Sequence, residues 1–177
     1  MFKYVAKPSR LTAFGSLRKF ATGANVVSLP ALRDVSGTPL NMSDKFKKRK
    51  VVVVGVVGAF TGTCTNKHVP SYIEAVGDLK AKGIDEVVVV TVNDHLVAKA
   101  WADEMGVKDE VTILADSDAS FTKSLGLDID LSAAGLGVRS KRYSLIVDDG
   151  VITQETVANN PGEVEQTGAD NILATLK

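Results

Sequence analysis

A run of valines that leads directly into a turn and a helix constrains this chain most. Residues 51–57 are all valine except Gly55. β-branched side chains favour extended strands, and a continuous apolar run indicates a strand buried on both faces. Residues 58–70 follow, hold the chain's single cysteine, Cys64, and pass into a helical apolar pattern. We therefore predict a buried strand, a turn, and a helix with a thiol in its first turn.

The rest of the chain continues this alternation of strands and helices. The predicted strands are 51–57, 86–92, 111–115, 142–147 and 151–157, and the predicted helices are 61–82, 94–106, 118–125 and 170–176. Pro70 is expected to kink the first helix. In the second helix the side chains expected to face inward are Leu96, Val97, Ala100 and Trp101. The turn Asp148-Asp149-Gly150 predicts a hairpin. Together these patterns predict an α/β fold with a mixed central β-sheet flanked by helices, formed by one domain over residues 26–177.

Charge and composition exclude several classes of function. Lys+Arg and Asp+Glu both total 21, so the net charge is zero. A main role in binding nucleic acid or an anionic membrane requires a basic surface. No apolar stretch approaches the ~18 to 20 residues that cross a bilayer. A metal site built on Cys64, His68 and His95 would lack closely spaced ligand pairs, so neither a metal nor a cofactor is predicted.

The first 25 residues differ from the rest. They contain lysine, arginine and several hydroxyl side chains, and no acidic residue precedes Asp34. This pattern is typical of an organelle transit peptide, and a disordered basic tail is the alternative. Residues 18–21, Arg-Lys-Phe-Ala, resemble a matrix-protease cleavage site. Import into the mitochondrial matrix is the favoured interpretation, ahead of the plastid or the cytoplasm.

Cys64 is expected to be reactive. Thr61 is a natural N-cap three residues earlier, and free backbone N–H groups in a first helical turn favour a thiolate. The alternative is a small buried apolar side chain. At ~100° per residue, Cys64 lies roughly 130° from the centre of the helix's apolar stripe. That stripe consists of Val69, Tyr72, Ile73 and Val76. The thiol is therefore predicted to point away from this core, with His68 on nearly the same face.

Several motifs, in order, resemble peroxiredoxins of the type II (type five) branch. They are Gly58 to Cys64 with Lys67 to Pro70, Thr91 to Asp94 with Ala98 to Trp101, and Gly135 to Tyr143 ahead of Asp148 to Gly150. The match runs from about Asp34 to Leu176. The resemblance implies a thioredoxin-like fold and an antioxidant enzyme that reduces hydrogen peroxide and organic hydroperoxides. Members of the family often form dimers.

The resemblance also implies roles for individual residues. Cys64 falls on the peroxidatic cysteine, and Thr61 on the threonine that holds the thiolate and the peroxide. Arg139 falls on the active-site arginine, whereas Lys141 and Arg142 nearby are expected to be solvated. Gly58, Thr61, Cys64 and His68 are the predicted substrate-contacting residues.

The chain departs from the family pattern in two ways. Val57 and Gly62 stand where the family usually has proline. The resolving cysteine is also missing, both near Thr167, where animal-type members carry it, and in residues 87–90, where plant-type members do. With no second thiol, a sulfenic acid on Cys64 must be reduced by another molecule. This implies a one-cysteine cycle that uses glutathione with glutaredoxin, or thioredoxin.

Two other functions fit a lone cysteine on this fold. A non-catalytic redox sensor or binding protein would keep the thiol but react slowly with peroxide. A cysteine hydrolase built on Cys64 and His68 is disfavoured, since two positions on one helix leave the base without an orienting group.

Overall fold

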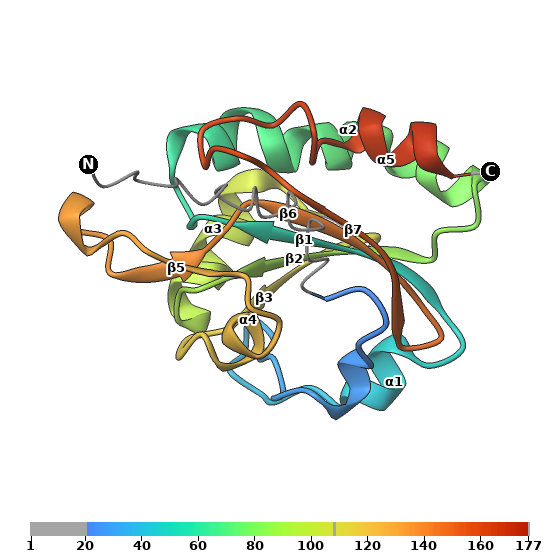
Figure 1. Ribbon diagram of the computed structural model, residues 1–177, viewed down its shortest axis with the longest axis horizontal. Coiled ribbons are helices and arrows are strands. Elements are labelled where there is room, and N and C mark those ends of the chain that lie inside the picture. Colours follow the sequence, from blue (N-terminus) through green and yellow to red (C-terminus); the bar gives the residue numbers. More distant parts are fainter. Residues whose placement is uncertain (1–20, 108, 177) are drawn as a thin grey trace, which may run out of the picture.

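A five-stranded mixed sheet forms the centre of the computed structural model, which describes residues 21–107 and 109–176. Its strand order is β3-β2-β1-β6-β7 (Figure 1). The strands are β1 Lys50–Val56, β2 Glu86–Thr91, β3 Val111–Ala115, β6 Tyr143–Asp148 and β7 Val151–Val157. β1, β2 and β3 run parallel, whereas β6 and β7 are antiparallel to their neighbours. The predicted mixed α/β architecture is confirmed.

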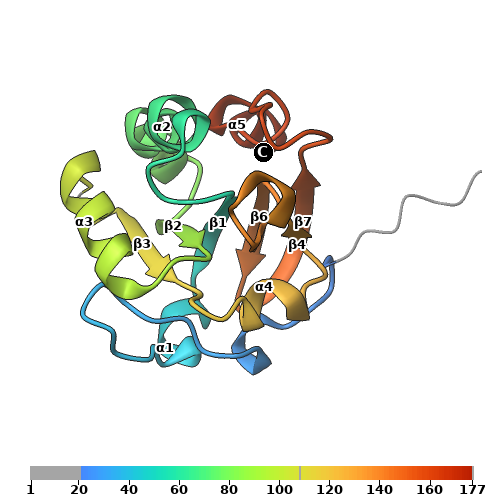
Figure 2. The same cartoon turned by 90° about the vertical axis from the view of Figure 1, so that its left-hand side faces the viewer.

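Helices cover both faces of this sheet. They are α1 Met42–Phe46, a π-helix Cys64–His68, α2 Val69–Ala81, α3 His95–Met105, α4 Ser120–Ser124 and α5 Ala169–Thr175, with 3-10 turns Val26–Ser28 and Ser132–Ala134. α2 and α5 lie over one face, and α1 and α4 lie over the other (Figure 2). A small second sheet pairs β4 Asp128–Asp130 with β5 Val138–Ser140.

The valine run explains how the sheet holds two cores apart. Successive side chains of a strand point to opposite faces. Val52, Val54 and Val56 therefore join the apolar cluster beneath α2, α3 and α5, while Val51 and Val53 join the cluster on the α1 and α4 side. Each valine is fully buried, and burying such a side chain contributes about 1.5 kcal/mol or more.

Gly55 interrupts the valine run because an aromatic ring occupies the space of its side chain. Gly55 pairs with Tyr143 across β1 and β6. A Cβ on Gly55 would lie 2.1 Å from the Cε1 atom of Tyr143, a ring that is itself fully buried. Any other residue at this position would displace the ring.

The inward face of α3 differs from the prediction. Leu96 is 68% exposed and Ala100 is also exposed, whereas Ala98 and Trp101 are buried. Asp94 caps the helix through its bonds to the Leu96 and Val97 amides. From that start, the face that meets the core carries the spacing Ala98, Trp101, Ala102 and Met105. Two stripes of helical period overlap in this sequence. Trp101 is buried as predicted, but the stripe that meets the core contains Ala98 instead of Leu96 and Ala100.

The segment just before residue 26 belongs to the folded domain. Ala21 is buried and donates its backbone N–H to Glu155 at 2.9 Å. The Gly23 amide donates to the Ile152 carbonyl at 2.8 Å, and the Ile152 amide donates back to Ala24 at 2.9 Å. The proposed transit peptide, residues 1–25, thus ends within a stretch that pairs with β7. Its first 20 residues lie outside the described part of the chain. Among the described helices, none has the length and apolarity to cross a membrane.

Removing residues 1–20 should leave the domain stable, whereas removing residues 1–25 should destabilise it. The longer deletion removes three inter-segment hydrogen bonds and the buried Ala21 side chain. At about 1 kcal/mol per bond, and with 2–4 °C per kcal/mol for a domain of this size, we expect its melting temperature to be roughly 5–10 °C lower. Circular dichroism melts of the two truncated chains measure this difference. Equal melting temperatures would show that residues 21–25 contribute nothing.

Candidate active site

Cys64 lies where β1 ends and the following helix begins, as the sequence predicts. Its side chain is fully buried and joins the same apolar cluster as Val69 and Tyr72. The prediction that it points away from that core is wrong. Residues 64–68 form a π-helix, in which the Val69 amide donates to the Cys64 carbonyl five residues back. The wider turn rotates Cys64 relative to α2, so a step of ~100° per residue does not apply.

Pro70 accounts for the position of this π-helix. Proline has no N–H and cannot bond to the carbonyl four residues earlier within an α-helix. Here Pro70 is the second residue of α2, which directly follows the π-helix, so the helical segment 62–81 lacks one backbone N–H at this point. The helix changes from π-helix to α-helix between His68 and Val69, and the kink expected at Pro70 stays a prediction.

Thr61 is tied to the turn that precedes the helix. Its hydroxyl donates to the Gly58 carbonyl at 2.8 Å, and its backbone N–H points to the same oxygen at 3.4 Å. The Thr61 carbonyl in turn accepts from the Thr65 amide at 2.9 Å. The Thr61 side chain therefore does not cap the helix as predicted. Its bond to Gly58 fixes the hydroxyl just before the helix begins.

Arg142, not Arg139, contacts the sulfur. The Nη2 atom of Arg142 lies 3.4 Å from the Sγ atom of Cys64. Nε and Nη2 both donate to the Pro161 carbonyl, at 3.0 and 2.7 Å, and Nη1 lies 2.9 Å from the Nδ1 atom of His68. Arg142 is 2% exposed, so the prediction that it is solvated is wrong.

Arg139 supports the turn instead of the thiol. Its Nε donates to the Leu136 carbonyl at 2.8 Å, and its Nη1 donates to the Asn93 side-chain oxygen at 3.2 Å. The same oxygen accepts from the Ala59 amide at 3.0 Å. A Cβ on Gly58 would lie 2.7 Å from Nη1 of Arg139. Gly58 thus allows the guanidinium to approach, and Arg139 holds the turn through Asn93.

His68 is buried between Arg142 and the C-terminal loop. Since arginine can only donate, the Nδ1 atom of His68 accepts from Arg142, and Nε2 carries the proton toward the Thr167 carbonyl at 2.9 Å. Burial lowers the pKa of His68 from 6.5 to about 4. The charge of Arg142 lowers this pKa further, while the bond to Thr167 opposes the shift. His68 is therefore neutral at pH 7 and orients the guanidinium.

A cavity of about 250 Å³ opens beside this cluster. The residues that line it are Val57, Thr61, Gly62, Thr63, Leu131, Leu136, Arg142, Pro161 and Gly162. Among the four predicted substrate-contacting residues, Thr61 lines the cavity, whereas Gly58, Cys64 and His68 do not. Arg142 lines the cavity and also touches Sγ, so it joins the open space to the thiol.

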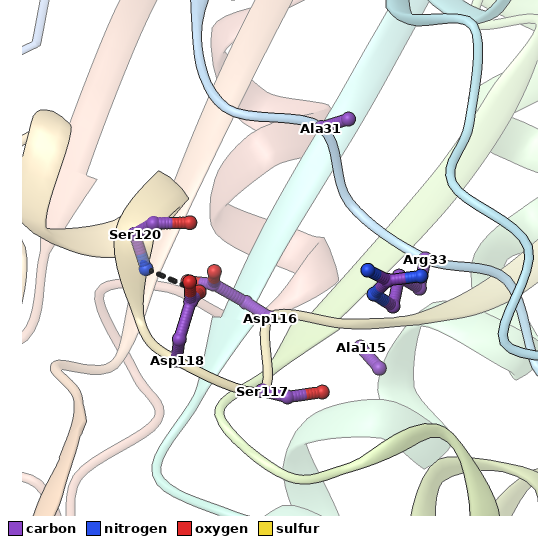
Figure 3. A pocket seen from close by; sticks show the side chains of 7 residues that line it. All are labelled: Ala31, Arg33, Ala115, Asp116, Ser117, Asp118 and Ser120. Atoms are coloured by element: carbon purple, nitrogen blue, oxygen red, sulfur yellow. Dashed lines mark hydrogen bonds between the residues drawn. The ribbon is translucent and has the colours of Figure 1, made fainter.

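A second cavity of similar volume lies between the loop that carries Arg33 and the end of β3 (Figure 3). Asp116 accepts from the Phe121 and Thr122 amides, and Asp118 accepts from the Ser120 amide. These carboxylates serve the start of the short helix α4. Within residues 21–107 and 109–176, no group of three or more His, Cys, Asp or Glu side chains is arranged to hold a metal ion.

Comparison with known proteins places this chain in a family. Residues 20–173 match the family model described as Redoxin. The chain is 48% identical to mitochondrial peroxiredoxin-2F of Arabidopsis thaliana over 141 residues, which is 80% of this chain and 69% of that protein. It is 43% identical to mitochondrial peroxiredoxin-2F of Oryza sativa subsp. japonica, over 92% of this chain and 85% of that protein. The crystal structure of reduced Prx3 from Vibrio vulnificus superposes with a TM-score of 0.80 at 41% identity, and covers 88% of this chain and 97% of that one.

The thioredoxin-like fold and these relatives define the class of protein: this chain is a thiol peroxidase. The chain belongs to the redoxin family, and within it to the peroxiredoxins of the type II branch. The predicted fold and family are confirmed. Peroxiredoxins reduce peroxides with thiol reductants and often dimerise. Relatives of similar identity are named as mitochondrial or as chloroplastic.

Replacing His68 by Gln should reduce the loss of stability in acid. A depressed histidine pKa stabilises the fold above the unfolded value of about 6.5, and this stabilisation is lost as the pH falls toward 4. A shift of this size corresponds to at most about 3 kcal/mol. Chemical denaturation at pH 7 and pH 5 should show the parent losing more unfolding free energy than His68→Gln. Identical losses would contradict a neutral, buried His68.

Proposed function

We propose that Cys64 is the peroxidatic cysteine of a peroxidase for hydrogen peroxide and organic hydroperoxides. The contact between Arg142 Nη2 and Sγ, at 3.4 Å, carries this proposal. The thiolate attacks one peroxide oxygen and the O–O bond breaks. Sulfur is oxidised to sulfenic acid, and the departing oxygen takes up a proton to leave as water or an alcohol. Arg142 and Thr61 are positioned to hold the two oxygens.

Magnitudes show why a charged group beside the sulfur is needed. A free thiol with a pKa of about 8.5 is ~3% ionised at pH 7, so full ionisation would accelerate the reaction by at most about 30-fold. Enzymes typically supply roughly 10⁶ or more. The remainder must come from alignment of the peroxide and from stabilisation of charge on the departing oxygen. Arg142 is suited to both, since its guanidinium is held by Pro161 and His68 before substrate arrives.

A solved relative supports peroxide as the substrate. Prx3 from Vibrio vulnificus has been crystallised in complex with hydrogen peroxide, and this chain matches that structure with a TM-score of 0.80 at 40% identity. The match covers 92% of this chain and all of that one. Transfer of this substrate to the present chain is part of our proposal.

The catalytic cycle that we propose uses one cysteine. Cys64 is the single cysteine of the sequence, so the sulfenic acid must be reduced by glutathione with glutaredoxin, or by thioredoxin. Cys64 has no exposed surface. A second thiol therefore reaches the sulfur only after the segment 61–68 opens locally.

We also propose location in the mitochondrial matrix, which an import assay on isolated mitochondria would measure.

A homodimer is the assembly that we propose. Phe60 is 52% exposed in the loop before Thr61, and Leu96 is 68% exposed at the start of α3. The Asn93 side chain, through its bond to the Ala59 amide, ties these two neighbouring segments together. Exposed apolar side chains that share one region favour contact with a second copy. Light scattering of the purified chain would reveal a monomer if this is wrong.

A redox sensor is the alternative function, and the departures at Val57 and Gly62 favour it. Loss of both usual prolines would loosen the loop that shields the thiol. A sensor would react with peroxide at a rate near that of a free thiol. The rate constant for oxidation of Cys64 by hydrogen peroxide therefore distinguishes the two functions.

Three substitutions test the assignment of the site. Cys64→Ser should abolish turnover, and Arg142→Ala should slow the oxidation of Cys64 by roughly a hundredfold because charge on the departing oxygen loses its partner. Arg139→Ala should have a smaller effect, since Arg139 acts through the turn. Stopped-flow measurements of thiol oxidation give these rates, with thermal melts and Arg142→Lys as controls for folding. A slower reaction for Arg139→Ala than for Arg142→Ala would reverse the assignment.

Oxidation without a reductant tests the one-cysteine cycle. One equivalent of hydrogen peroxide should convert each chain to a sulfenic acid that a diketone reagent traps, with no disulfide-linked pairs on a non-reducing gel. Mass spectrometry measures the trapped adduct. Steady-state assays with glutathione plus glutaredoxin, and with thioredoxin, should then show turnover with one of them. A disulfide between two chains as the main product would refute the cycle.

A further inference from the structure

Tyr72 carries a buried hydroxyl that shares a hydrogen-bond acceptor with His68. Tyr72 lies on α2, is fully buried, and donates its hydroxyl proton to the Thr167 carbonyl at 2.6 Å. Burial raises the pKa of Tyr72 well above that of a free tyrosine, so the hydroxyl is a donor at neutral pH. The same carbonyl accepts from Nε2 of His68 at 2.9 Å. A carbonyl oxygen has two lone pairs, and both are used here.

A continuous chain of hydrogen bonds leads from this carbonyl to the sulfur. Nε2 of His68 donates to the Thr167 carbonyl, which leaves the Nδ1 lone pair for Nη1 of Arg142 at 2.9 Å. Nη2 of Arg142 lies 3.4 Å from Sγ of Cys64. If the carbonyl moved away from His68, the proton could occupy Nδ1, and Arg142, which can only donate, would lose its acceptor. The position of one backbone oxygen therefore helps to determine how the guanidinium meets the thiol.

Tyr72 is suited to fix that oxygen because it belongs to a regular helix, whereas Thr167 lies in a loop. The loop connects β7 to α5 over residues 158–168. It also supplies the Pro161 carbonyl that accepts from Nε and Nη2 of Arg142. A tyrosine side chain has only two χ angles, so it holds an acceptor at little entropic cost. The hydroxyl thus ties to α2 the loop that holds the arginine.

We propose that Tyr72 is a positioning residue for the peroxidase reaction, and that its hydroxyl holds His68 in the tautomer that orients Arg142. Tyr72 lies one helical turn beyond His68, and their two rings meet edge to face with centroids 5.7 Å apart. The hydroxyl acts through the Thr167 carbonyl and takes part in no proton transfer, so the reaction is the one given above. This inference rests on the proposed peroxidase function of Cys64.

Removing the single oxygen atom of the Tyr72 side chain tests this proposal. Tyr72→Phe keeps the ring that packs against His68 and removes only the bond to the Thr167 carbonyl. We expect the rate constant for oxidation of Cys64 by hydrogen peroxide to fall about fivefold to tenfold, which corresponds to the net contribution of one hydrogen bond. Stopped-flow measurements of thiol oxidation give this rate constant.

Tyr143→Phe provides the matched control. The Tyr143 side chain is also fully buried, and within residues 21–107 and 109–176 its hydroxyl has no hydrogen-bond partner. Tyr143 follows Arg142 directly in the chain, but it belongs to the apolar cluster on the α1 and α4 side of the sheet. This variant should therefore oxidise Cys64 at the rate of the parent. Thermal melts of both variants identify any loss of folding.

Two further measurements separate positioning from a general loss of stability. NMR spectra of isotope-labelled histidine should show the His68 proton on Nε2 in the parent. In Tyr72→Phe the resonances of the two ring nitrogens should move toward each other as the second tautomer becomes populated. The chain has two histidines, so a His95→Gln variant assigns the signals. When Arg142→Ala is already present, adding Tyr72→Phe should slow the reaction no further, because a positioning residue acts through the group that it positions.

The outcomes separate this inference from the proposed function. An unchanged rate constant in Tyr72→Phe, or an equal slowing in Tyr143→Phe, overturns the role of Tyr72 and leaves the peroxidase function intact. A slowing of the same size in the presence of Arg142→Ala also overturns it. So does an unchanged His68 spectrum, which decides alone if Arg142→Ala does not fold. A Cys64→Ser variant with full activity overturns the function itself.

Discussion

The contact between the Arg142 guanidinium and the Cys64 sulfur is the interaction on which the site depends. Placing a charge in the interior is costly unless hydrogen bonds replace its hydration. Arg142 meets this requirement through the Pro161 carbonyl, the His68 ring and the sulfur itself. If any of these partners is removed, the buried guanidinium loses a hydrogen bond that replaces part of its hydration. The geometry of the thiol therefore follows from how the arginine is held.

The loop after β7 supplies two backbone carbonyls to this arrangement. Pro161 accepts from Arg142, and Thr167 accepts from both His68 and the Tyr72 hydroxyl. Backbone oxygens are available whatever side chains the loop carries. The loop can thus lack the cysteine that animal-type relatives place near its end and still hold the site together. Among the described residues, the buried Thr167 hydroxyl has no hydrogen-bond partner, so Thr167 contributes to the site through its backbone carbonyl.

The strands could be predicted because each is encoded by a short run of neighbouring residues. The site could be predicted only in part. Runs of β-branched residues gave β1, β2 and β3 within a residue or two, and the Asp149-Gly150 turn gave the hairpin. The short elements α1, β4 and β5 carry no such signal. The predicted direction of the Cys64 side chain was wrong because a π-helix changes the angle between successive residues. This π-helix depends on Pro70 and on tertiary packing. Arg139 and Arg142 lie three residues apart, and sequence alone does not reveal which one enters the core.

The same geometry explains why two departures from the family pattern can be tolerated. Val57 is almost completely buried, so an apolar wall remains where a proline would stand. Gly62 loses the rigidity that proline gives to a helix start, but Thr61 is bonded to Gly58, and Arg139 holds the same turn through Asn93. Hydrogen bonds that cross the turn thus offset part of the restriction of backbone dihedrals that the two prolines would give.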